Sequence, residues 1–552
     1  MRLRLLGDVA LVGILAGTLL FSNLGGHPLW DPDEARPALI ARNVWTSPDV
    51  RGWLVPSIYG RPYHDKPILL YWVVAQSYRI AGPTAFAARA VSATAALATT
   101  IAVFLWARAR WSRAAAAASA IVLCTTGEFV GLGRIINHDM LLTLWTTLAL
   151  LGLHRWATRS SEGATLLPVA VAAALGTLTK GLVTPILVGV IGALYLATTG
   201  RLGFLRGARL GPAALLFVAV AGPWYLAAGI IDPAYLRDFV LEQHLARFFA
   251  PTPHLRPQPF GMTLLFAVIG FMPWTLMLPA VVRRLASGTD DATWFCVCWA
   301  VGVVGFFSLS RGGLGTYVLP AMPALALLTG RFVSAQAPSA LLPERRLVLG
   351  GLAVGAVLAL LVLVATHAGA GRWTPVLEPV ALPSLALVLL AALFLAPVVA
   401  RRADLAAPAV ALAGIVAAIT FSVRTSPALS RVASDAELAR QIAATAPTGK
   451  APVIAYAVLA PSLGFYHDGP VRRLEQPARL RHVLRRRKLV FVVTDAAHAP
   501  EVLGAGRFSA LGAGRHLLFA SQPTGDPIAA GTSGRFRNGR DGRNVAGNDV
   551  LR

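Results

Sequence analysis

The segment 30–67 concentrates ionisable side chains between long apolar stretches of the chain. Asp33 and Glu34 stand just beyond the first apolar stretch, and Asp65 and Lys66 precede a short one. A carboxylate can serve as general base toward a hydroxyl or amine, and a lysine cation suits a phosphate. Each of these roles has a structural alternative. Asp33 and Glu34 could belong to a solvated loop or cap a helix, and Lys66 could extend its cation from the membrane interface into water. Together these residues predict a site that handles a phosphate and a nucleophile.

Two later loops could contribute to the same site. Asp139 opens an apolar stretch, with Arg134 five residues earlier. A carboxylate at membrane depth is costly and usually functional, although a helix dipole can also stabilise it. The glycine-rich turn 310–317 permits close backbone approach and ends at Tyr317, or it is a plain connection between helices. It does not end in Gly-Lys-Ser/Thr, so it is not a nucleotide-binding Walker loop.

A third candidate lies in the run from Phe239 to Phe248. His244 and Arg247 share a helical face there, as residues three apart do, and Glu242 precedes them. His244 could bind a metal or be an ordinary surface residue, and Arg247 could hold a phosphate bidentately.

The composition predicts a polytopic α-helical membrane protein. Apolar residues make up 56% of the 552, against about 45–50% in soluble proteins. Runs of about 17–25 apolar residues recur, each long enough to cross a bilayer, and an open sheet cannot face lipid. The net charge of +24 indicates arginine-rich cytoplasmic loops rather than nucleic-acid binding. The three cysteines lie in apolar stretches and predict neither disulfides nor a zinc cluster.

We predict thirteen spans and a retained N-terminal anchor. The candidate spans are 5–24, 84–107, 114–131, 138–157, 165–179, 182–198, 211–231, 260–282, 292–310, 315–334, 347–367, 380–400 and 405–423. With the N-terminus in the cytoplasm, the short arginine-rich loops fall on the cytoplasmic side, following the positive-inside rule. The loops that carry the candidate site residues then gather on the opposite face.

The composition changes after residue 421. Short β-type runs at 453–458 and 489–493 alternate with arginine-rich helical stretches such as 474–488. We therefore predict a transmembrane domain at 1–424 that includes a catalytic loop at 25–83, a small α/β domain at 425–522 outside the cytoplasm, and a disordered tail at 523–552.

The ordered set of motifs over about residues 1–335 resembles the integral-membrane glycosyltransferases of the aminoarabinose transferase and protein O-mannosyltransferase superfamily, in particular the lipid A branch. The motifs are Pro32-Asp33-Glu34-Ala35-Arg36, Trp53-Leu54-Val55-Pro56, Tyr63-His64-Asp65-Lys66-Pro67, Arg134 to Met140, Lys180-Gly181, Pro223-Trp224-Tyr225, His244 to Phe248, Pro273-Trp274 and the turn from Ser310 to Tyr317. The chain departs from the family pattern at Asp65, where Glu is usual, and at His138, where Thr is usual.

The resemblance implies a C-type glycosyltransferase fold in a bacterial inner membrane, with periplasmic catalytic loops. It implies a polyprenyl-phosphate sugar donor and an envelope acceptor, either a glycolipid such as lipid A or a protein. By the same resemblance, Asp33, Glu34 and Asp139 would act on the acceptor. The residues expected at the donor phosphate are Arg36, Lys66, Arg247 and Tyr317. A divalent metal is possible at Asp65, Glu242 and His244, and no nucleotide cofactor is expected.

Two other classes of protein compete with this interpretation. A transporter or flippase would also have many spans and buried charges, but it usually places them near the midplane, often in internal repeats. A non-catalytic scaffold would leave the acidic run unexplained.

Overall fold

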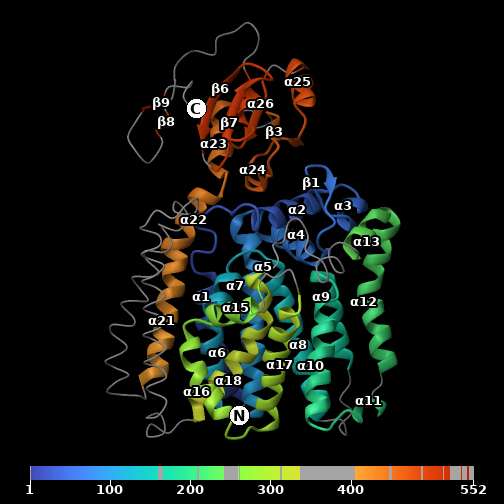
Figure 1. The fold of residues 1–552 in the computed structure, drawn as a ribbon, viewed down its shortest axis with the longest axis vertical. Coiled ribbons are helices and arrows are strands. Elements are labelled where there is room, and N and C mark those ends of the chain that lie inside the picture. Colours follow the sequence, from blue (N-terminus) through green and yellow to red (C-terminus); the bar gives the residue numbers. More distant parts are fainter. Residues whose placement is uncertain are drawn as a thin grey trace. The chain divides into compact units, whose positions relative to one another are not determined.

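The computed structural model divides into two compact units (Figure 1). It describes residues 2–158, 166–207, 210–240, 259, 261–310, 314–335, 405–446, 451–486, 489–513, 515–521, 536–537 and 544–545. The first unit comprises Met1–His27, Ile40–Pro56 and Pro62–Ala428, and the second comprises Pro28–Leu39, Ser57–Arg61 and Leu429–Arg552. The acidic segment 31–34 therefore belongs to the same unit as the C-terminal sheet.

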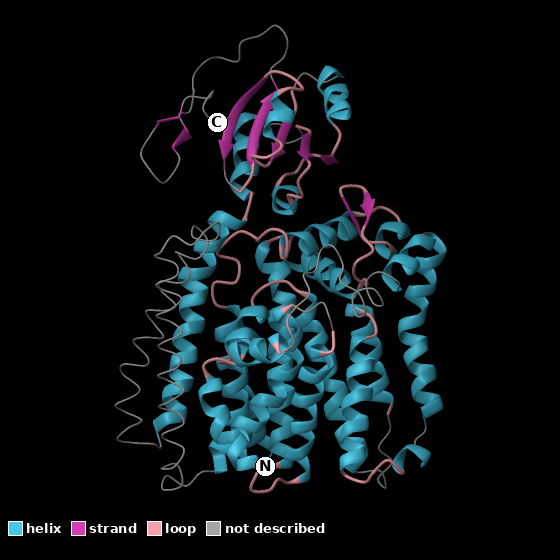
Figure 2. Ribbon diagram, viewed as in Figure 1, coloured by secondary structure: helices cyan, strands magenta, loops and turns pink. Residues whose placement is uncertain are grey.

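The first unit is a bundle of α-helices (Figure 2). Its described helices are α1 (Arg2–Phe21), α3 (Val50–Leu54), α4 (Leu69–Ala81), α5 (Ala85–Arg110), α6 (Arg113–Cys124), α7 (Gly127–Gly133), α8 (His138–Thr158), α9 (Leu167–Lys180), α10 (Val183–Thr198), α11 (Phe204–Gly207), α12 (Leu210–Ile231), α13 (Pro233–Val240), α15 (Met262–Gly270), η3 (Trp274–Met277), α16 (Leu278–Leu285), α17 (Asp291–Ser308), η4 (Gly315–Ala321), α18 (Met322–Ala335), α21 (Ala406–Thr420) and η7 (Phe421–Thr425). Two helices, α2 (Ala35–Thr46) and α22 (Ser426–Ala433), begin in one unit and end in the other.

Several of these helices can span a membrane. Among the described residues, six are long and apolar enough, or up to eight spans if two bent helix pairs are counted as one span each. The bent pairs are α6 with α7, at 65°, and α15 with η3–α16, at 104°. The predicted spans at 138–157, 165–179 and 182–198 fall on α8, α9 and α10, while those at 347–367 and 380–400 lie outside the described residues. The chain is a mostly helical multi-pass membrane protein, and the count of thirteen spans stays a prediction.

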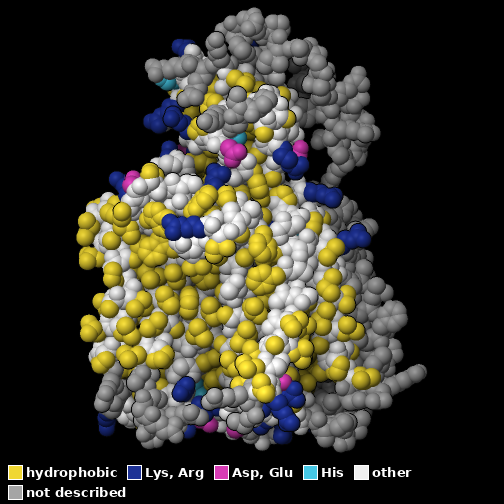
Figure 3. All heavy atoms as spheres, turned by 180° about the vertical axis from the view of Figure 1, so that it is seen from behind, with side chains coloured by type: hydrophobic (Ala, Val, Ile, Leu, Met, Phe, Trp, Pro, Cys, Tyr) yellow, Lys and Arg dark blue, Asp and Glu magenta, His cyan; other side chains and the backbone are white. Residues whose placement is uncertain are grey.

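The outer surface of the bundle is apolar, as contact with lipid requires. Leu11 and Ile14 on α1 are both 68% exposed, and Leu215 and Ile230 on α12 are 71% and 72% exposed. Apolar side chains cover most of the bundle face in Figure 3. Exposure on this scale would be unfavourable in water, so these faces indicate the hydrocarbon region of a bilayer.

Small residues let helices within the bundle approach closely. A Cβ atom placed on Gly330 of α18 would lie 2.4 Å from the backbone nitrogen of Ser119 on α6. A Cβ atom on Gly176 of α9 would lie 2.5 Å from the Cβ of Thr184 on α10. Membrane helices lack a hydrophobic driving force toward one another, so such close packing supplies much of their association.

The second unit contains a five-stranded mixed sheet with the strand order β4-β3-β5-β7-β6. Its strands are β3 (Val453–Tyr456), β4 (Val471–Leu474), β5 (Phe491–Thr494), β6 (Phe508–Ala513) and β7 (Leu517–Ser521), and its helices are α23 (Ala436–Thr445), α24 (Pro461–Tyr466), α25 (Pro477–Arg486) and α26 (Ala499–Leu503). Strand β3 pairs in parallel with β4 and β5, and β7 pairs antiparallel with β5 and β6.

Successive residues of the central strands β3 and β5 pack alternately into two hydrophobic cores, one on each face of the sheet. Val453 and Phe491 pack with Leu438 and Leu463, while Ile454 and Val492 pack on the opposite face of the sheet with residues such as Leu480. This alternation follows from the two-residue period of a strand and explains why every residue of β3 and β5 is buried. The hairpin β1 (Ser57–Ile58) with β2 (Arg61–Pro62) and the pair β8 (Phe536–Arg537) with β9 (Asn544–Val545) complete the described strands.

Candidate functional site

The first polar cluster in the helical bundle joins Asp139, Lys180 and Tyr317. Asp139, in the first turn of α8, forms an ion pair with Lys180 at the end of α9, and their side chains are 13% and 12% exposed. The Lys180 ammonium nitrogen also lies 4.3 Å from the centre of the Tyr317 ring in η4. Gly181 follows with a φ of +74°, a conformation that ends the helix at low cost and leaves the lysine at its terminus. The cation is thus fixed between a carboxylate and an aromatic face.

Lys66 lies near this cluster. The charges of Lys66 and Lys180 both act on the imidazole of His138, the residue before Asp139. His138 packs edge-on against Tyr71 of α4, with ring centroids 5.4 Å apart. Its Nε2 atom is buried and makes no hydrogen bond within the part of the chain that the structure describes. Two lysine cations thus act on one buried ring, and although Asp139 balances one of them, both are of the kind that binds a phosphate.

The loop that carries Lys66 is hydrogen-bonded to residues in and directly before α13. His64 binds two carboxylates, with Nδ1 at 2.8 Å from Asp238 and Nε2 at 3.0 Å from Asp232. The Tyr235 hydroxyl donates to the carbonyl of Lys66 at 2.6 Å. Because both ring nitrogens face carboxylates, this environment favours the doubly protonated form of His64. Burial alone would lower its pKa, but the hydrogen bonds to Asp238 and Asp232 outweigh burial and raise the pKa of His64.

Two buried arginines of the bundle have structural partners. Arg134 donates to the carbonyls of Leu19 at 2.6 Å and Leu20 at 3.0 Å, at the C-terminal end of α1. Arg89 donates to the carbonyls of Leu24 and His27, both at 2.9 Å. Each guanidinium satisfies carbonyl groups that a helix end or a tight turn leaves without partners. Arg134 therefore does not pair with Asp139, although the two stand close in sequence.

The acidic segment belongs to the second unit and shows one exposed carboxylate. Asp33 is exposed, whereas Asp31 is 9% exposed and Glu34 is fully buried. An oxygen of Glu34 accepts from the backbone nitrogen of Trp30 at 3.1 Å, which closes the turn before α2. Arg36 follows in the first turn of that helix and is partly exposed. Within this segment Asp33 has the geometry to meet a solvent-borne group.

Other predicted site residues lie outside the described residues. These are Glu242, His244, Arg247 and the glycine turn at 311–313. The described residues contain no group of three or more His, Cys, Asp and Glu side chains that could hold a metal. The divalent metal at Asp65, Glu242 and His244 stays a prediction.

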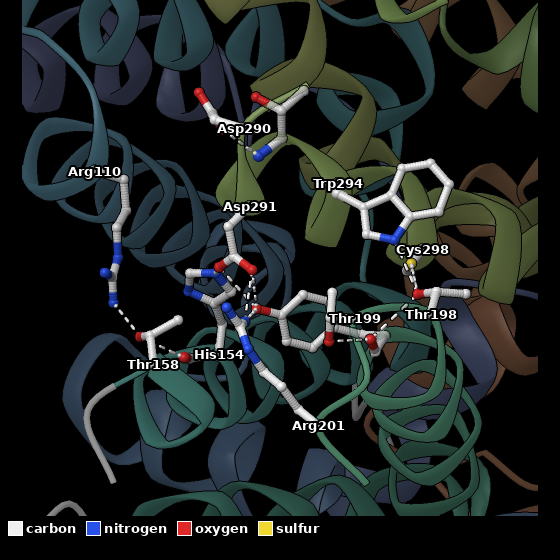
Figure 4. Close-up of polar contacts among 12 residues, drawn as sticks. Arg110, His154, Thr158, Thr198, Thr199, Arg201, Asp290, Asp291, Trp294 and Cys298 are labelled. Carbon is white, nitrogen blue, oxygen red and sulfur yellow. Dashed lines mark hydrogen bonds and ion pairs between the residues drawn. The ribbon is translucent and has the colours of Figure 1, made fainter. Parts of the chain in front are cut away.

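A second polar cluster lies at the other end of α8 (Figure 4). Asp291, at the start of α17, accepts from Arg201 at 2.5 Å and from the Tyr195 hydroxyl at 2.8 Å. His154 points into the same group, with Nε2 at 3.4 Å from Asp291. His154 is fifteen residues along α8 from Asp139, or roughly 22 Å at the helical rise. The cluster ties α8, α10 and α17 together far from the lysines, so we assign it to stability.

The sequence analysis named Lys180 and His64 only as parts of family motifs, without a role for either side chain, and it did not name Tyr235. The sequence does hold a signal for Lys180, because it ends an apolar stretch directly before a glycine and a cation at membrane depth is usually functional. No local pattern points to the partners of His64, because Asp232 and Asp238 are 168 and 174 residues away in sequence.

Comparisons with known proteins agree with the resemblance seen in the motifs. Residues 65–226 match the family described as dolichyl-phosphate-mannose-protein mannosyltransferase. The chain is similar to an undecaprenyl phosphate-alpha-4-amino-4-deoxy-L-arabinose arabinosyl transferase of Pseudomonas fluorescens, at 32% identity over 335 residues, and to one of Pseudomonas aeruginosa, at 31% over 328 residues. The first alignment covers 59% of this chain and 58% of the relative, and the second covers 58% of each. The chain thus spans under two thirds of the length of the curated relatives it matches.

The fold also has a solved counterpart. The crystal structure of ArnT from Cupriavidus metallidurans bound to undecaprenyl phosphate superposes with a TM-score of 0.78 at 21% identity, covering 93% of this chain and 98% of that one. The same protein in the apo state gives a TM-score of 0.77. At this identity the likeness establishes the shared fold.

Proposed function

We propose that this chain, a member of the integral-membrane superfamily of aminoarabinose transferases and protein mannosyltransferases, transfers a sugar from a polyprenyl-phosphate donor to an envelope acceptor. The acceptor is a glycolipid of the lipid A type or a protein. The observation that carries the proposal is the buried ion pair between Asp139 and Lys180 in the helical bundle, with Lys66 acting on the neighbouring imidazole of His138. All four residues lie within the stretch that matches the mannosyltransferase family.

The donor phosphate is the group that the two lysines suit. In the reaction, the bond between the anomeric carbon and the phosphate oxygen breaks, and polyprenyl phosphate leaves with the electron pair. Negative charge grows on that phosphate, so cations held in place beforehand stabilise the transition state. Lys66 and Lys180 supply two such cations, and Arg36, Arg247 and Tyr317 are further candidates for the phosphate.

The acceptor loses a proton as its oxygen or nitrogen bonds to the anomeric carbon. Asp33 is the proposed general base, because it is the exposed carboxylate of the acidic segment. Glu34 supports the turn through its bond to Trp30. Asp139 holds Lys180 and orients the acceptor. A divalent metal at Asp65, Glu242 and His244 would lend further positive charge to the phosphate.

We also propose a location for the activity. The protein lies in the bacterial inner membrane with thirteen spans, a cytoplasmic N-terminus and periplasmic catalytic loops. The arginines near the helix ends around Asp291, such as Arg110 and Arg201, support this orientation, because cationic residues collect on the cytoplasmic side. The α/β domain would then be periplasmic.

Mass spectrometry of envelope lipids and glycoproteins, with and without the protein, tests the proposal. We expect a sugar-modified lipid A or glycoprotein that disappears with the gene and returns with the intact chain. The first donor to assay with the purified protein is undecaprenyl phosphate carrying 4-amino-4-deoxy-L-arabinose, the sugar named for the relatives. If the purified chain moves lipid-linked sugar across the bilayer and transfers none, the flippase alternative replaces this proposal.

A further inference from the structure

The four residues from Pro28 to Asp31 are hydrogen-bonded to the C-terminal part of the second unit. Asp31 is central: one carboxylate oxygen accepts from the backbone nitrogen of Ser462 at 2.7 Å, and the other accepts from the Ser462 hydroxyl. The backbone nitrogen of Asp31 donates to the carbonyl of Ala433, also at 2.7 Å. Asp31 and Ser462 are 431 residues apart in sequence, so this contact depends entirely on tertiary structure.

The three preceding residues extend the attachment. The indole nitrogen of Trp30 donates to the Ser430 hydroxyl at 2.7 Å, and that hydroxyl donates to the carbonyl of Pro28 at 3.0 Å. The backbone nitrogen of Leu29 donates to the Tyr466 hydroxyl at 2.9 Å. Such a continuous set of bonds defines the backbone path of the segment rather than a single point of contact.

Behind Ser462 lies a second buried carboxylate. The Ser462 hydroxyl accepts from the backbone nitrogen of Asp435, whose own carboxylate meets Nδ1 of His516 at 2.6 Å. Asp435 is fully buried. Burial and the neighbouring charge of Asp435 raise the pKa of Asp31 to about 7. Placing two carboxylates together in a buried site is costly, and a buried polar network is a known means of specifying one arrangement.

A glycine in α24 lets the N-terminal stretches of the second unit pack closely against this helix. A Cβ atom on Gly464 would lie 2.9 Å from Cδ2 of Leu39 and 3.3 Å from Cε1 of Tyr59. Both N-terminal stretches of the second unit therefore press against α24 at a residue without a side chain. A larger residue would push them away.

The result is a segment in which one carboxylate points to solvent from a fixed backbone. Asp31 and Glu34 are buried in internal hydrogen bonds, and Asp33 between them is exposed. We infer that the C-terminal sheet domain is a positioning element of the enzyme, in which Ser462 and its partner Asp31 hold the peptide that carries Asp33. This inference rests on the proposed function, because it takes Asp33 as the general base.

The test uses the full-length chain in proteoliposomes. Ser462→Ala removes the hydroxyl from the network, Ser462→Thr restores it, and Trp30→Phe removes the separate bond to Ser430. The matched control is Tyr456→Phe, which removes a hydroxyl bonded to Glu501 in the same domain. Four quantities are measured: hydrogen exchange of the amides of residues 29–35, affinity for undecaprenyl phosphate, and kcat and donor KM for transfer from undecaprenyl phosphate-aminoarabinose to lipid A.

For Ser462→Ala and Trp30→Phe we expect faster exchange at residues 29–35 and a fall in kcat. A displacement of about 1 Å can cost about a hundredfold, so the expected loss is roughly ten- to a hundredfold. Donor KM and undecaprenyl-phosphate affinity should change much less than kcat, since Lys66 and Lys180 lie in the first unit and only Arg36 of the candidate phosphate residues lies beside the segment. Ser462→Thr should recover most of kcat, and Tyr456→Phe should change none of the four quantities.

Three outcomes would overturn the inference. Unchanged kcat despite faster exchange would mean that the placement of the segment does not matter. Parallel losses of kcat and phosphate affinity would mean that the domain only stabilises the protein. If the wild-type chain transfers no sugar while Ser462→Ala still accelerates exchange, the proposed function itself has failed, and the catalytic role of the attachment fails with it.

Discussion

Replacing Asp139 by Asn should tighten the binding of polyprenyl phosphate while it slows transfer. Asp139 neutralises Lys180, one of two cations proposed for the phosphate. The carboxylate therefore competes with the donor for the same ammonium group. Asn keeps the shape and removes the competing charge.

The magnitude follows from the burial of the pair. The two side chains are 13% and 12% exposed, so solvent screens them weakly. With an effective dielectric constant of about 20, two unit charges roughly 6 Å apart interact by about 3 kcal/mol, and this is an upper bound on the repulsion between Asp139 and a phosphate held by Lys180. Allowing for relaxation and water, we expect about tenfold tighter binding. Loss of the acceptor-side carboxylate should lower kcat by about a hundredfold or more.

Isothermal titration of the purified protein with undecaprenyl phosphate measures the first effect, and a transfer assay measures the second. Asp291→Asn is the matched control, because it removes a carboxylate that pairs with Arg201 at the other end of α8. Its affinity for undecaprenyl phosphate should equal that of the wild type. Weaker binding by Asp139→Asn would refute the competition, since it would mean that Asp139 is needed to present Lys180 to the phosphate.

Four further outcomes are expected. Lys66→Ala should weaken undecaprenyl-phosphate binding by about ten- to a hundredfold, the worth of a charge-assisted bond of about 1.5–3 kcal/mol, and Lys66→Arg should recover only part in the same titration. Asp33→Asn should lower kcat by about 10²–10⁴-fold at unchanged phosphate affinity; near-normal turnover would leave Asp33 a structural residue. The pKa of His64 is raised in the folded protein above its unfolded value of 6.5. The charged imidazole therefore stabilises the fold fully below pH 6.5, and this stabilisation is lost as pH rises through the higher folded pKa. The melting temperature should fall over that range in the wild type and not in His64→Gln. A cysteine at Gly52 should react with an impermeant thiol reagent from the periplasm and one at Gly200 should not, and the reverse pattern would contradict the proposed orientation.

Local sequence patterns were sufficient to predict a mostly helical multi-pass membrane protein. An apolar run of sufficient length forms a helix in lipid because its backbone groups must bond to one another, and this requirement acts within the run itself. The β-type runs near 453 and 491 became β3 and β5 for a similarly local reason, since each buries alternate residues on two faces. The motif from Tyr63 to Pro67 likewise marked the lysine that lies near Lys180 and His138.

Tertiary structure decided which charged groups act on one another. Asp139 pairs with Lys180, 41 residues away, and not with Arg134, which caps α1 instead. His64 and Asp31 find their partners 168 to 431 residues away in sequence. Coulombic attraction and hydrogen bonds depend on distance in space and on burial. The spacing of residues along a chain determines neither distance nor burial. The sequence by itself therefore determined that this is a helical membrane protein with an acidic and a cationic motif, while only the packing of helices and sheet decided the partner of each charge.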